Sequence, residues 1–323
     1  MKTSRRDFVI KSTLATAGMA FGFNTSEASR ATATYNASRA TAPAVARLEG
    51  GPAKICFFSK DLPGFDYDEI ASLVAEAGFD GIDLTVRQKG HVLPENVEKD
   101  LPRAAEAAKK AGLKIYTIAT DILDAAEKFT EPILKTASSL GIGYYRMGPR
   151  FYDAKKSIPQ NLADFRIRYE LLAKMNKKYK IKGECQNHSG DRFGAAVWDQ
   201  WEVLKGMDPQ WIGVQYDLLH ATLEGVNSWT LGFNLVKPYI GTMDMKDFYW
   251  KRIDGKWDLV LTPLGEGMVD FKTLIALLKT NNMHGPFSIH CEYLSEKQDR
   301  PTKVAKMKKD LTTLRGWLND AGL

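Results

Sequence analysis

The feature that most constrains this chain of 323 residues is a repeated alternation of short apolar runs with longer amphipathic stretches. Short apolar runs are typical of buried strands, and the amphipathic stretches have the spacing of surface helices. Strands that alternate with helices lie parallel in one sheet, because each helix carries the chain back across it. The pattern repeats eight times, and we predict strands over 54–58, 81–86, 114–119, 144–148, 181–186, 211–216, 239–245 and 285–293.

Helices are predicted between these strands. Three of them end at a glycine just before the next strand, at Gly78, Gly112 and Gly141, as helix C-termini commonly do. The clearest helical patterns cover 67–78, 97–112, 131–141, 162–179, 271–280 and 302–320.

Repeated strand–helix units from residue 52 to residue 323 predict one α/β domain, a single closed (β/α)₈ TIM barrel. The alternative is an open doubly wound sheet, in which a glycine-rich phosphate-binding turn follows the first strand. Residues 59–69, SKDLPGFDYDE, contain no such motif. The barrel is therefore favoured, and no second domain is expected.

The first residues have the features of an export signal. Ser4, Arg5, Arg6, Phe8 and Lys11 match the twin-arginine pattern S-R-R-x-F-x-x-K. The apolar stretch that follows is too short for a stable membrane span. We therefore predict a periplasmic or exported protein that is carried by the twin-arginine translocase, and an ordinary amphipathic helix is the alternative. The predicted signal covers residues 1–30, and a flexible linker rich in Ala, Ser and Thr covers 31–51.

Composition excludes two classes of protein. The formal net charge is +6, but the basic residues lie on predicted helix faces and are not interleaved with aromatic residues, so we expect no nucleic-acid partner. The three cysteines, Cys56, Cys185 and Cys291, each lie within an apolar run. This predicts buried thiols rather than a disulfide framework. These features leave the oligomeric state open.

Polar side chains gather at the carboxyl ends of the predicted strands, which meet at one face of a barrel and carry its chemistry. Asp217 ends the sixth run, and His220 follows it. For an isolated Asp at this position a helix cap is the simplest explanation. Similar residues follow other strands, however, and the ring that they form favours a site. Its members are Arg87, His91, Arg146, Gln186, Asn187, His188, Asp217, His220, Asp244, Lys246, Asp247 and Glu292.

Several of these motifs resemble the xylose isomerase-like TIM-barrel family, which contains sugar isomerases and epimerases, inosose dehydratase-like enzymes and an endonuclease branch. The resemblance covers residues 54–319 and includes D-x-x-H at Asp217 and His220. The endonuclease branch needs a histidine-rich cluster of three metals, and this chain has five histidines in all. The other motifs are AEAGFDGIDL, GHVLPENVEKDLP, NHSG, MKDF, PLGEGMVDF and CEY.

The resemblance implies one divalent metal ion at the barrel mouth. The family's ligands are Glu, Asp, His and Glu on strands five to eight, and the matching positions here are Gln186, Asp217, Asp244 and Glu292. Two positions depart from the family, with Gln for Glu and Asp for His. Oxygen donors favour Mn²⁺ or Mg²⁺, with Ca²⁺ also possible, whereas an added histidine nitrogen would extend the choice to Zn²⁺ or Co²⁺.

Gln186 also bears on the chemistry, because family epimerases use carboxylates on strands five and eight and an amide cannot act as a base. We expect proton abstraction next to a metal-polarised carbonyl, with a base on one face of the substrate. Glu184 is expected to be a buried partner of another polar group. The candidate catalytic residues are Glu292, His188, His220 and Lys246, and the candidate substrate-binding residues are Arg87, Arg146, Asn187 and Asp247.

The implied function is that of an exported, metal-dependent sugar isomerase or epimerase acting on a small sugar or sugar derivative. Two alternatives remain open. One is a lyase or hydratase of keto-sugars or 3-keto-glycosides, which the neutral Gln186 favours. The other is a barrel that binds sugar without catalysis, because two ligand positions are altered.

Overall fold

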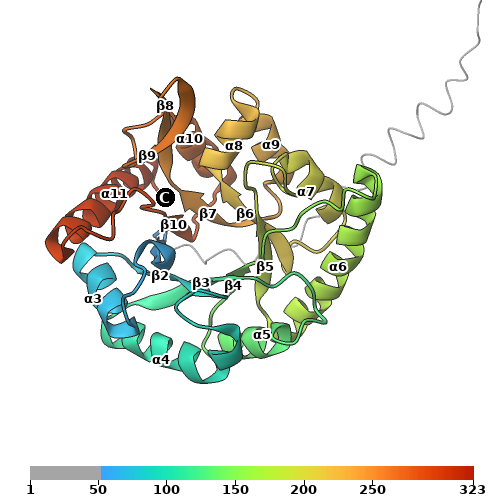
Figure 1. The fold of residues 1–323 in the computed structure, drawn as a ribbon, viewed down its shortest axis with the longest axis horizontal. Helices are drawn as coiled ribbons and strands as arrows, with labels where there is room; N and C mark the ends of the chain where they lie inside the picture. The colour runs from blue at the N-terminus through green and yellow to red at the C-terminus, as the bar shows by residue number, and fades with distance from the viewer. Residues whose placement is uncertain (1–51) are drawn as a thin grey trace, which may run out of the picture. The chain divides into compact units, whose positions relative to one another are not determined.

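The computed structural model describes residues 52–323. These residues form a closed barrel of eight parallel strands, which confirms the predicted fold (Figure 1). Neighbouring strands follow the order of the chain, and the last barrel strand closes the ring against the first. The predicted signal and linker lie outside the described residues. The barrel strands are β1 (Ile55–Phe58), β2 (Gly81–Val86), β3 (Lys114–Thr120), β4 (Tyr144–Arg146), β5 (Lys182–Gln186), β6 (Ile212–Asp217), β7 (Ile240–Met245) and β10 (Phe287–Ile289).

Helices surround the barrel (Figure 1). Capping residues in the sequence set where some of these helices begin and end. Asp66 and Glu69 form a capping box at one helix, Ser157 and Gln160 form another, and Gly78 ends the first of these helices at a φ of 92°. The helices are α3 (Tyr67–Ala77), α4 (Val97–Lys110), α5 (Thr130–Ser139), α6 (Ile158–Tyr179), α7 (Val197–Leu204), α8 (Leu218–Gly225), α9 (Trp229–Val236), α10 (Phe271–Asn281) and α11 (Arg300–Ala321), with short 3₁₀ turns at η1 (Ser59–Asp61) and η2 (Pro94–Asn96).

A polar layer lies inside the barrel, two residues before Gln186 on β5. Glu184 is buried there, as expected, and it accepts a hydrogen bond of 2.6 Å from Thr242 and pairs with Lys182 at 3.3 Å. Burial raises the pKa of Glu184 to about 7. Gly241 makes room for this carboxylate, because a Cβ at that position would lie 2.0 Å from Glu184 Oε1.

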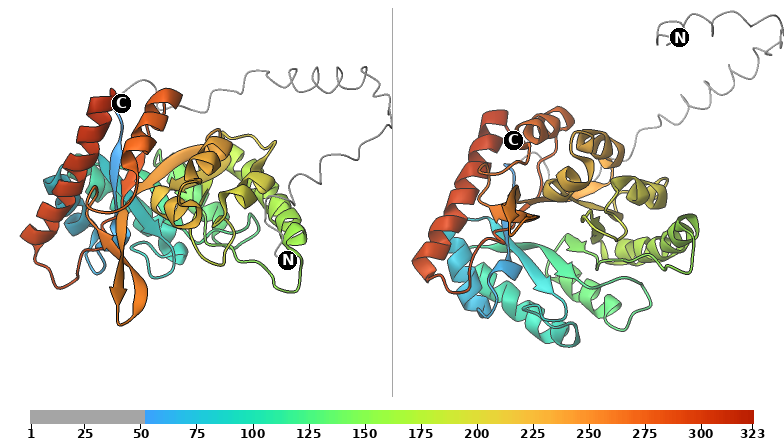
Figure 2. Two further views of the ribbon diagram at one scale, coloured as in Figure 1. Left: turned by 90° about the horizontal axis from the view of Figure 1, so that it is seen from above. Right: turned by 45° about the horizontal axis from the view of Figure 1, so that its top comes forward.

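A two-stranded antiparallel hairpin leaves the carboxyl end of the barrel directly after β7, and Figure 2 shows it projecting from the body. Its strands are β8 (Asp247–Ile253) and β9 (Lys256–Thr262). The sequence pattern predicts no strand here. The Asp254-Gly255 pair is nevertheless a hairpin-turn signal in the sequence. Both residues adopt positive φ, as such a turn requires.

Asp247 fixes the base of this hairpin. Its Oδ1 accepts the backbone N–H groups of Phe248 and Val269, and its Oδ2 accepts those of Gly265 and Gly267. A buried carboxylate with four donors is fully engaged. Asp247, which directly follows Lys246, therefore holds both the hairpin and the loop before α10 in place.

Two further expectations concern the described part of the chain. The thiols of Cys56, Cys185 and Cys291 are free and buried, as predicted. No helix between residues 52 and 323 combines the length and the apolar character that a membrane crossing requires.

Candidate active site

A cavity of about 160 Å³ opens at the carboxyl ends of the barrel strands. Several strands supply its wall, with Phe58 on β1, Arg146 on β4 and Gln186 on β5. Lys246 follows β7, and Glu292 follows β10. The cavity therefore lies where the barrel prediction placed the chemistry.

Lys246 lies at the centre of the predicted site. Its ammonium nitrogen is 3.1 Å from Asp217 Oδ2, 3.3 Å from Glu292 Oε1 and 3.0 Å from His220 Nε2. Burial lowers the pKa of Lys246, but the facing carboxylates of Asp217, Glu292 and Asp244 outweigh burial and raise it above the ordinary value. The side chain is therefore a buried cation whose three protons each have an acceptor.

His220 and His188 are two neutral imidazoles beside this cation. Burial, with Lys246 adding to it, lowers the pKa of His220 far below its ordinary value, and burial also lowers that of His188. The rings stack with their centroids 3.7 Å apart. Lys246 can only donate to His220 Nε2, so Nδ1 of that ring carries the proton and donates to Ser189 Oγ at 2.9 Å.

The orientation of the Gln186 amide is fixed from both sides. Its nitrogen donates to Asp217 Oδ2 at 2.9 Å and to Asp244 Oδ2 at 2.7 Å. Its oxygen accepts from Arg146 Nη1 at 3.2 Å, and an arginine can only donate. The amide therefore presents hydrogens, not its oxygen, to the two carboxylates.

His290 is a second cation of the site. Burial lowers its pKa, but Asp244 and Glu292 outweigh burial and raise the pKa to about 9. In return, His290 and Lys246 hold the pKa of Glu292 well below its ordinary value, although burial acts in the opposite direction. Lys60 adds a contact of 3.2 Å to Glu292 Oε2. Glu292 is thus ionised and surrounded by positive charge.

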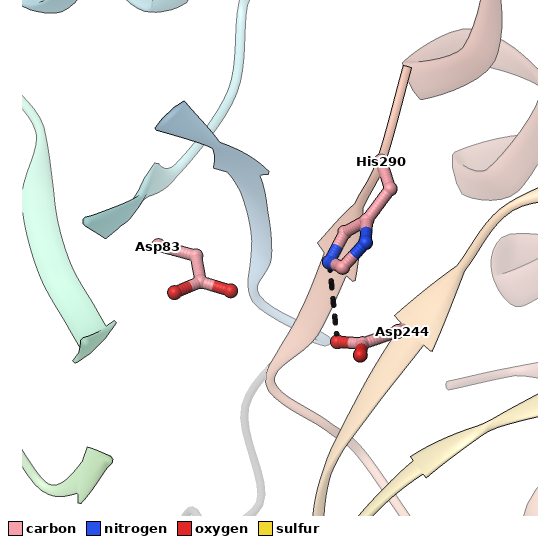
Figure 3. Close-up of side chains that lie close together, drawn as sticks. All are labelled: Asp83, Asp244 and His290. Atoms are coloured by element: carbon pink, nitrogen blue, oxygen red, sulfur yellow. Dashed lines mark ion pairs between the residues drawn. The ribbon is translucent and has the colours of Figure 1, made fainter. Parts of the chain in front are cut away.

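Asp83, Asp244 and His290 form a buried group that could hold a metal ion (Figure 3). His290 Nε2 lies 3.3 Å from Asp244 Oδ1, and Asp83 faces both from β2. Asp83 Oδ2 accepts from Ser288, whereas Asp83 Oδ1 and both ring nitrogens of His290 have no hydrogen-bond partner among residues 52–323. Unsatisfied buried polar atoms that converge in this way suit an ion or ordered water.

The four side chains predicted as metal ligands come together, but their polar atoms are already engaged. Gln186 turns its nitrogen to Asp217 and Asp244, and the Lys246 ammonium lies between Asp217 and Glu292. In this arrangement they do not offer a divalent ion an open set of oxygen donors. That ligand set stays a prediction. Asp244 belongs to both sets, and its two oxygens accept from Gln186 and Gln215, so the free atoms of the group with Asp83 are Asp83 Oδ1 and the ring nitrogens of His290.

The predicted substrate-binding residues fall into two pairs. Arg87 and Arg146 line the cavity. Asn187 is buried and bonds the backbone of Asp217 through both ends of its amide, at 2.9 and 2.7 Å, and Asp247 anchors the hairpin. Neither belongs to the cavity wall, so their role in substrate binding stays a prediction and their visible role is to position the backbone.

Several residues of the site were not predicted from the sequence. Lys60, Arg150 and Arg192 line the cavity from loops or short turns, where no periodic pattern marks them. Asp83 had a signal, because an aspartate in the apolar run GIDLTV has to lie inside the barrel or be paired. His290 lies in the strand predicted over 285–293 but was not among the candidate site residues.

Residues 71–317 match the family model described as xylose isomerase-like TIM barrel. The chain belongs to this family. A search of curated proteins found no match.

Solved structures of this fold are distant in sequence. The chain is similar to a probable 3-DHS dehydratase, AsbF, from Bacillus anthracis, with 16% identity, a TM-score of 0.61 and coverage of 81% of this chain and 98% of that one. It is also similar to the 3-keto-D-glucoside 4-epimerase YcjR from E. coli, with 15% identity, a TM-score of 0.62 and coverage of 82% and 99%. A D-allulose 3-epimerase from Methylomonas sp., solved in complex with D-allulose, is similar as well. Its sequence identity is 14% and its TM-score 0.61, with coverage of 82% of this chain and 97% of that one. These likenesses show the fold.

Proposed function

We propose that this chain is a sugar isomerase or epimerase-like enzyme that moves a proton at a carbon next to a carbonyl group. The observation that carries the proposal is the buried Lys246 ammonium, held between carboxylates and a neutral imidazole at the wall of the cavity. Membership of the xylose isomerase-like family and the epimerases and dehydratase among similar structures support it. The cavity of about 160 Å³ suits a single sugar unit.

Three residues have different roles in the proposed reaction. His188 lines the cavity, is neutral, and has Nδ1 2.9 Å from the carbonyl oxygen of Ser189, so its Nε2 carries a free lone pair that can accept a proton. The Lys246 ammonium stabilises the negative charge that develops on the substrate oxygen. Glu292 keeps Lys246 charged and is the second possible proton acceptor on the cavity wall.

For the metal, we propose Mn²⁺ or Mg²⁺ held by Asp83, Asp244 and His290. Two carboxylates and an imidazole suit these ions, and Zn²⁺, Co²⁺ or Ca²⁺ are the alternatives. A bound ion would supply Lewis-acid polarisation of the substrate. A metal-binding imidazole must be neutral, so His290 would release its proton on binding.

A lyase or hydratase acting on a keto-sugar is the second candidate. Gln186 favours it, because an amide locked between Asp217 and Asp244 cannot replace the strand-five carboxylate that the family's epimerases use as a base. Abstraction of a proton from one face is sufficient for elimination, whereas a two-base epimerase needs a partner on the opposite face.

The test is proton exchange in D₂O with a panel of keto-sugars, followed by NMR before and after treatment with EDTA. We expect deuterium at the carbon next to the carbonyl, together with an isomer or epimer, and slower exchange after EDTA that Mn²⁺ restores. Loss of water from the substrate would instead establish the lyase. Binding of sugars without any exchange would contradict the proposal and leave a sugar-binding barrel.

We also propose that the protein is exported through the twin-arginine translocase, which carries folded proteins. The support is the pattern around Arg5 and Arg6 in the sequence. Replacing both arginines, Arg5→Lys with Arg6→Lys, is expected to leave the protein in the cytoplasm when it is produced in its native host. Cell fractionation checks this, and normal amounts of the double variant in the periplasm would disprove the route.

A further inference from the structure

The charges on the cavity wall are strongly unbalanced. Glu292 is the one carboxylate among the lining residues of the described chain, and it is already paired with Lys60 and Lys246. Apart from His188 and His290, the remaining basic side chains are arginines. They are Arg87, Arg146, Arg150 and Arg192.

These four arginines have no carboxylate partner in the described part of the chain. None of them lies within 4.0 Å of an Asp or Glu oxygen between residues 52 and 323. Arg146 and Arg150 are only 9% and 7% exposed. Burial raises the pKa of Asp83 and the facing charge of Arg146 opposes that rise, whereas the buried Arg150 has no carboxylate partner. Burying a guanidinium without a paired counter-charge is costly, so Arg150 and the arginines around it indicate a site for an anion.

Arg150 and Arg192 are held in place by contacts that leave donors free. The Arg150 guanidinium lies over the rings of Phe165 and Tyr169, at 5.2 and 5.6 Å from their centroids, and that of Arg192 lies 5.2 Å over Phe151. Arg150 also donates through Nη2 to the carbonyl oxygen of Leu123, and the Nε atoms of both arginines are buried without a hydrogen-bond partner among residues 52–323. Stacking supports a guanidinium from its face and leaves its edge available for a ligand.

The two loops that carry these arginines are joined to each other. The backbone N–H of Phe193 donates to the carbonyl of Arg150 at 3.0 Å, and Phe151 forms an antiparallel bridge with Arg192. The loop after β4 and the loop after β5 therefore present their guanidinium groups as one unit. Such preorganisation is what recognition of a small anion requires.

We propose that the substrate of this enzyme is an anionic sugar derivative, whose carboxylate is bound by Arg150 and Arg192 with help from Arg146. A sugar phosphate offers similar oxygens, but a carboxylate is planar, matches the guanidinium fork and takes less of a cavity of about 160 Å³. This inference rests on the proposed function and names the substrate class of the same cavity.

The first experiment measures binding of a hexuronate, of its uncharged methyl ester and of a hexose 6-phosphate by calorimetry. We expect the hexuronate to bind at least about tenfold more tightly than the ester, as one charge-assisted pair can supply. Arg192→Met should reduce that ratio to near one. Arg103→Met, which alters an exposed arginine on α4, should leave it unchanged. Equal binding of acid and ester would overturn the proposal, and a preference for the phosphate would replace the carboxylate by a phosphoryl group.

The second experiment does not depend on the choice of sugar. Thermal unfolding is followed with acetate, phosphate or chloride at equal ionic strength, and acetate is expected to stabilise the parent but not the Arg150→Met, Arg192→Met double variant. If neither oxyanion stabilises the parent more than chloride and the hexuronate does not bind, the anion site is refuted. Proton exchange without an anion preference would refute only this inference, whereas an anion preference without exchange would refute only the proposed enzymatic reaction.

Discussion

Replacing Lys246 by methionine is expected to reduce turnover at least about 10²-fold and to destabilise the barrel by about 3–5 kcal/mol. The reason is that Asp217 and Glu292 lose the ammonium that lies 3.1 and 3.3 Å from their oxygens, and Asp217 is fully buried. Removing one partner of a buried ion pair leaves the other charge uncompensated. Turnover is measured with the substrate that shows exchange, and stability by denaturant unfolding.

A matched control is Lys178→Met, because Lys178 forms an exposed pair with Glu131 on the outside of the barrel. Exposed pairs contribute little, so this variant should keep both stability and turnover. A second readout is added Mn²⁺, which should stabilise Lys246→Met more than the parent, because the carboxylates of Asp217 and Glu292 are then free to bind it. Unchanged turnover in Lys246→Met would show that the ammonium is only a structural counter-charge.

Replacing His188 by glutamine is expected to lower turnover about 10²- to 10⁴-fold and to abolish exchange of the substrate proton with D₂O. Binding of the same sugar should change much less, since glutamine keeps a polar side chain at the cavity wall. The measurements are exchange by NMR and affinity by calorimetry. His284→Gln, outside the cavity, serves as the control and should behave like the parent.

The alternative base is distinguished by the companion variant Glu292→Gln. If exchange persists in His188→Gln but is lost in Glu292→Gln, the carboxylate is the proton acceptor and the assignment of His188 is wrong. This outcome would be informative, because three cations hold the pKa of Glu292 low and a carboxylate in that environment is a weak base.

The barrel could be predicted from the sequence because most of its strands are short apolar runs that a helical pattern follows. Even the buried position of Glu184 followed from period-two alternation along β5. The hairpin after β7 was missed because it interrupts the strand–helix repeat, and both of its strands are partly exposed. Its Asp254-Gly255 turn was the available signal.

The site was predictable only in part. A residue's place at the carboxyl end of a strand can be predicted from the sequence, but its role depends on which side chains it contacts in the folded barrel. Nothing local to Lys246 shows that its ammonium lies between Asp217 and Glu292, which are far away in the chain. The same holds for Gln186, whose amide is oriented by Arg146, 40 residues earlier. Arg150 and Arg192 lie on loops, where neither periodicity nor spacing marks a residue that faces a cavity.

Asp217 divides its two oxygens between two tasks. Its Oδ1 accepts the backbone N–H of His220 at 3.2 Å and caps α8, while its Oδ2 accepts from Gln186 and pairs with Lys246. The fold would therefore select for an aspartate here even in a descendant that had lost its activity. In comparing relatives of this chain, an aspartate at this position is weak evidence of catalysis. Under the mechanism that we propose, a histidine at the position of His188, which caps no helix, is the more informative marker of an active lineage.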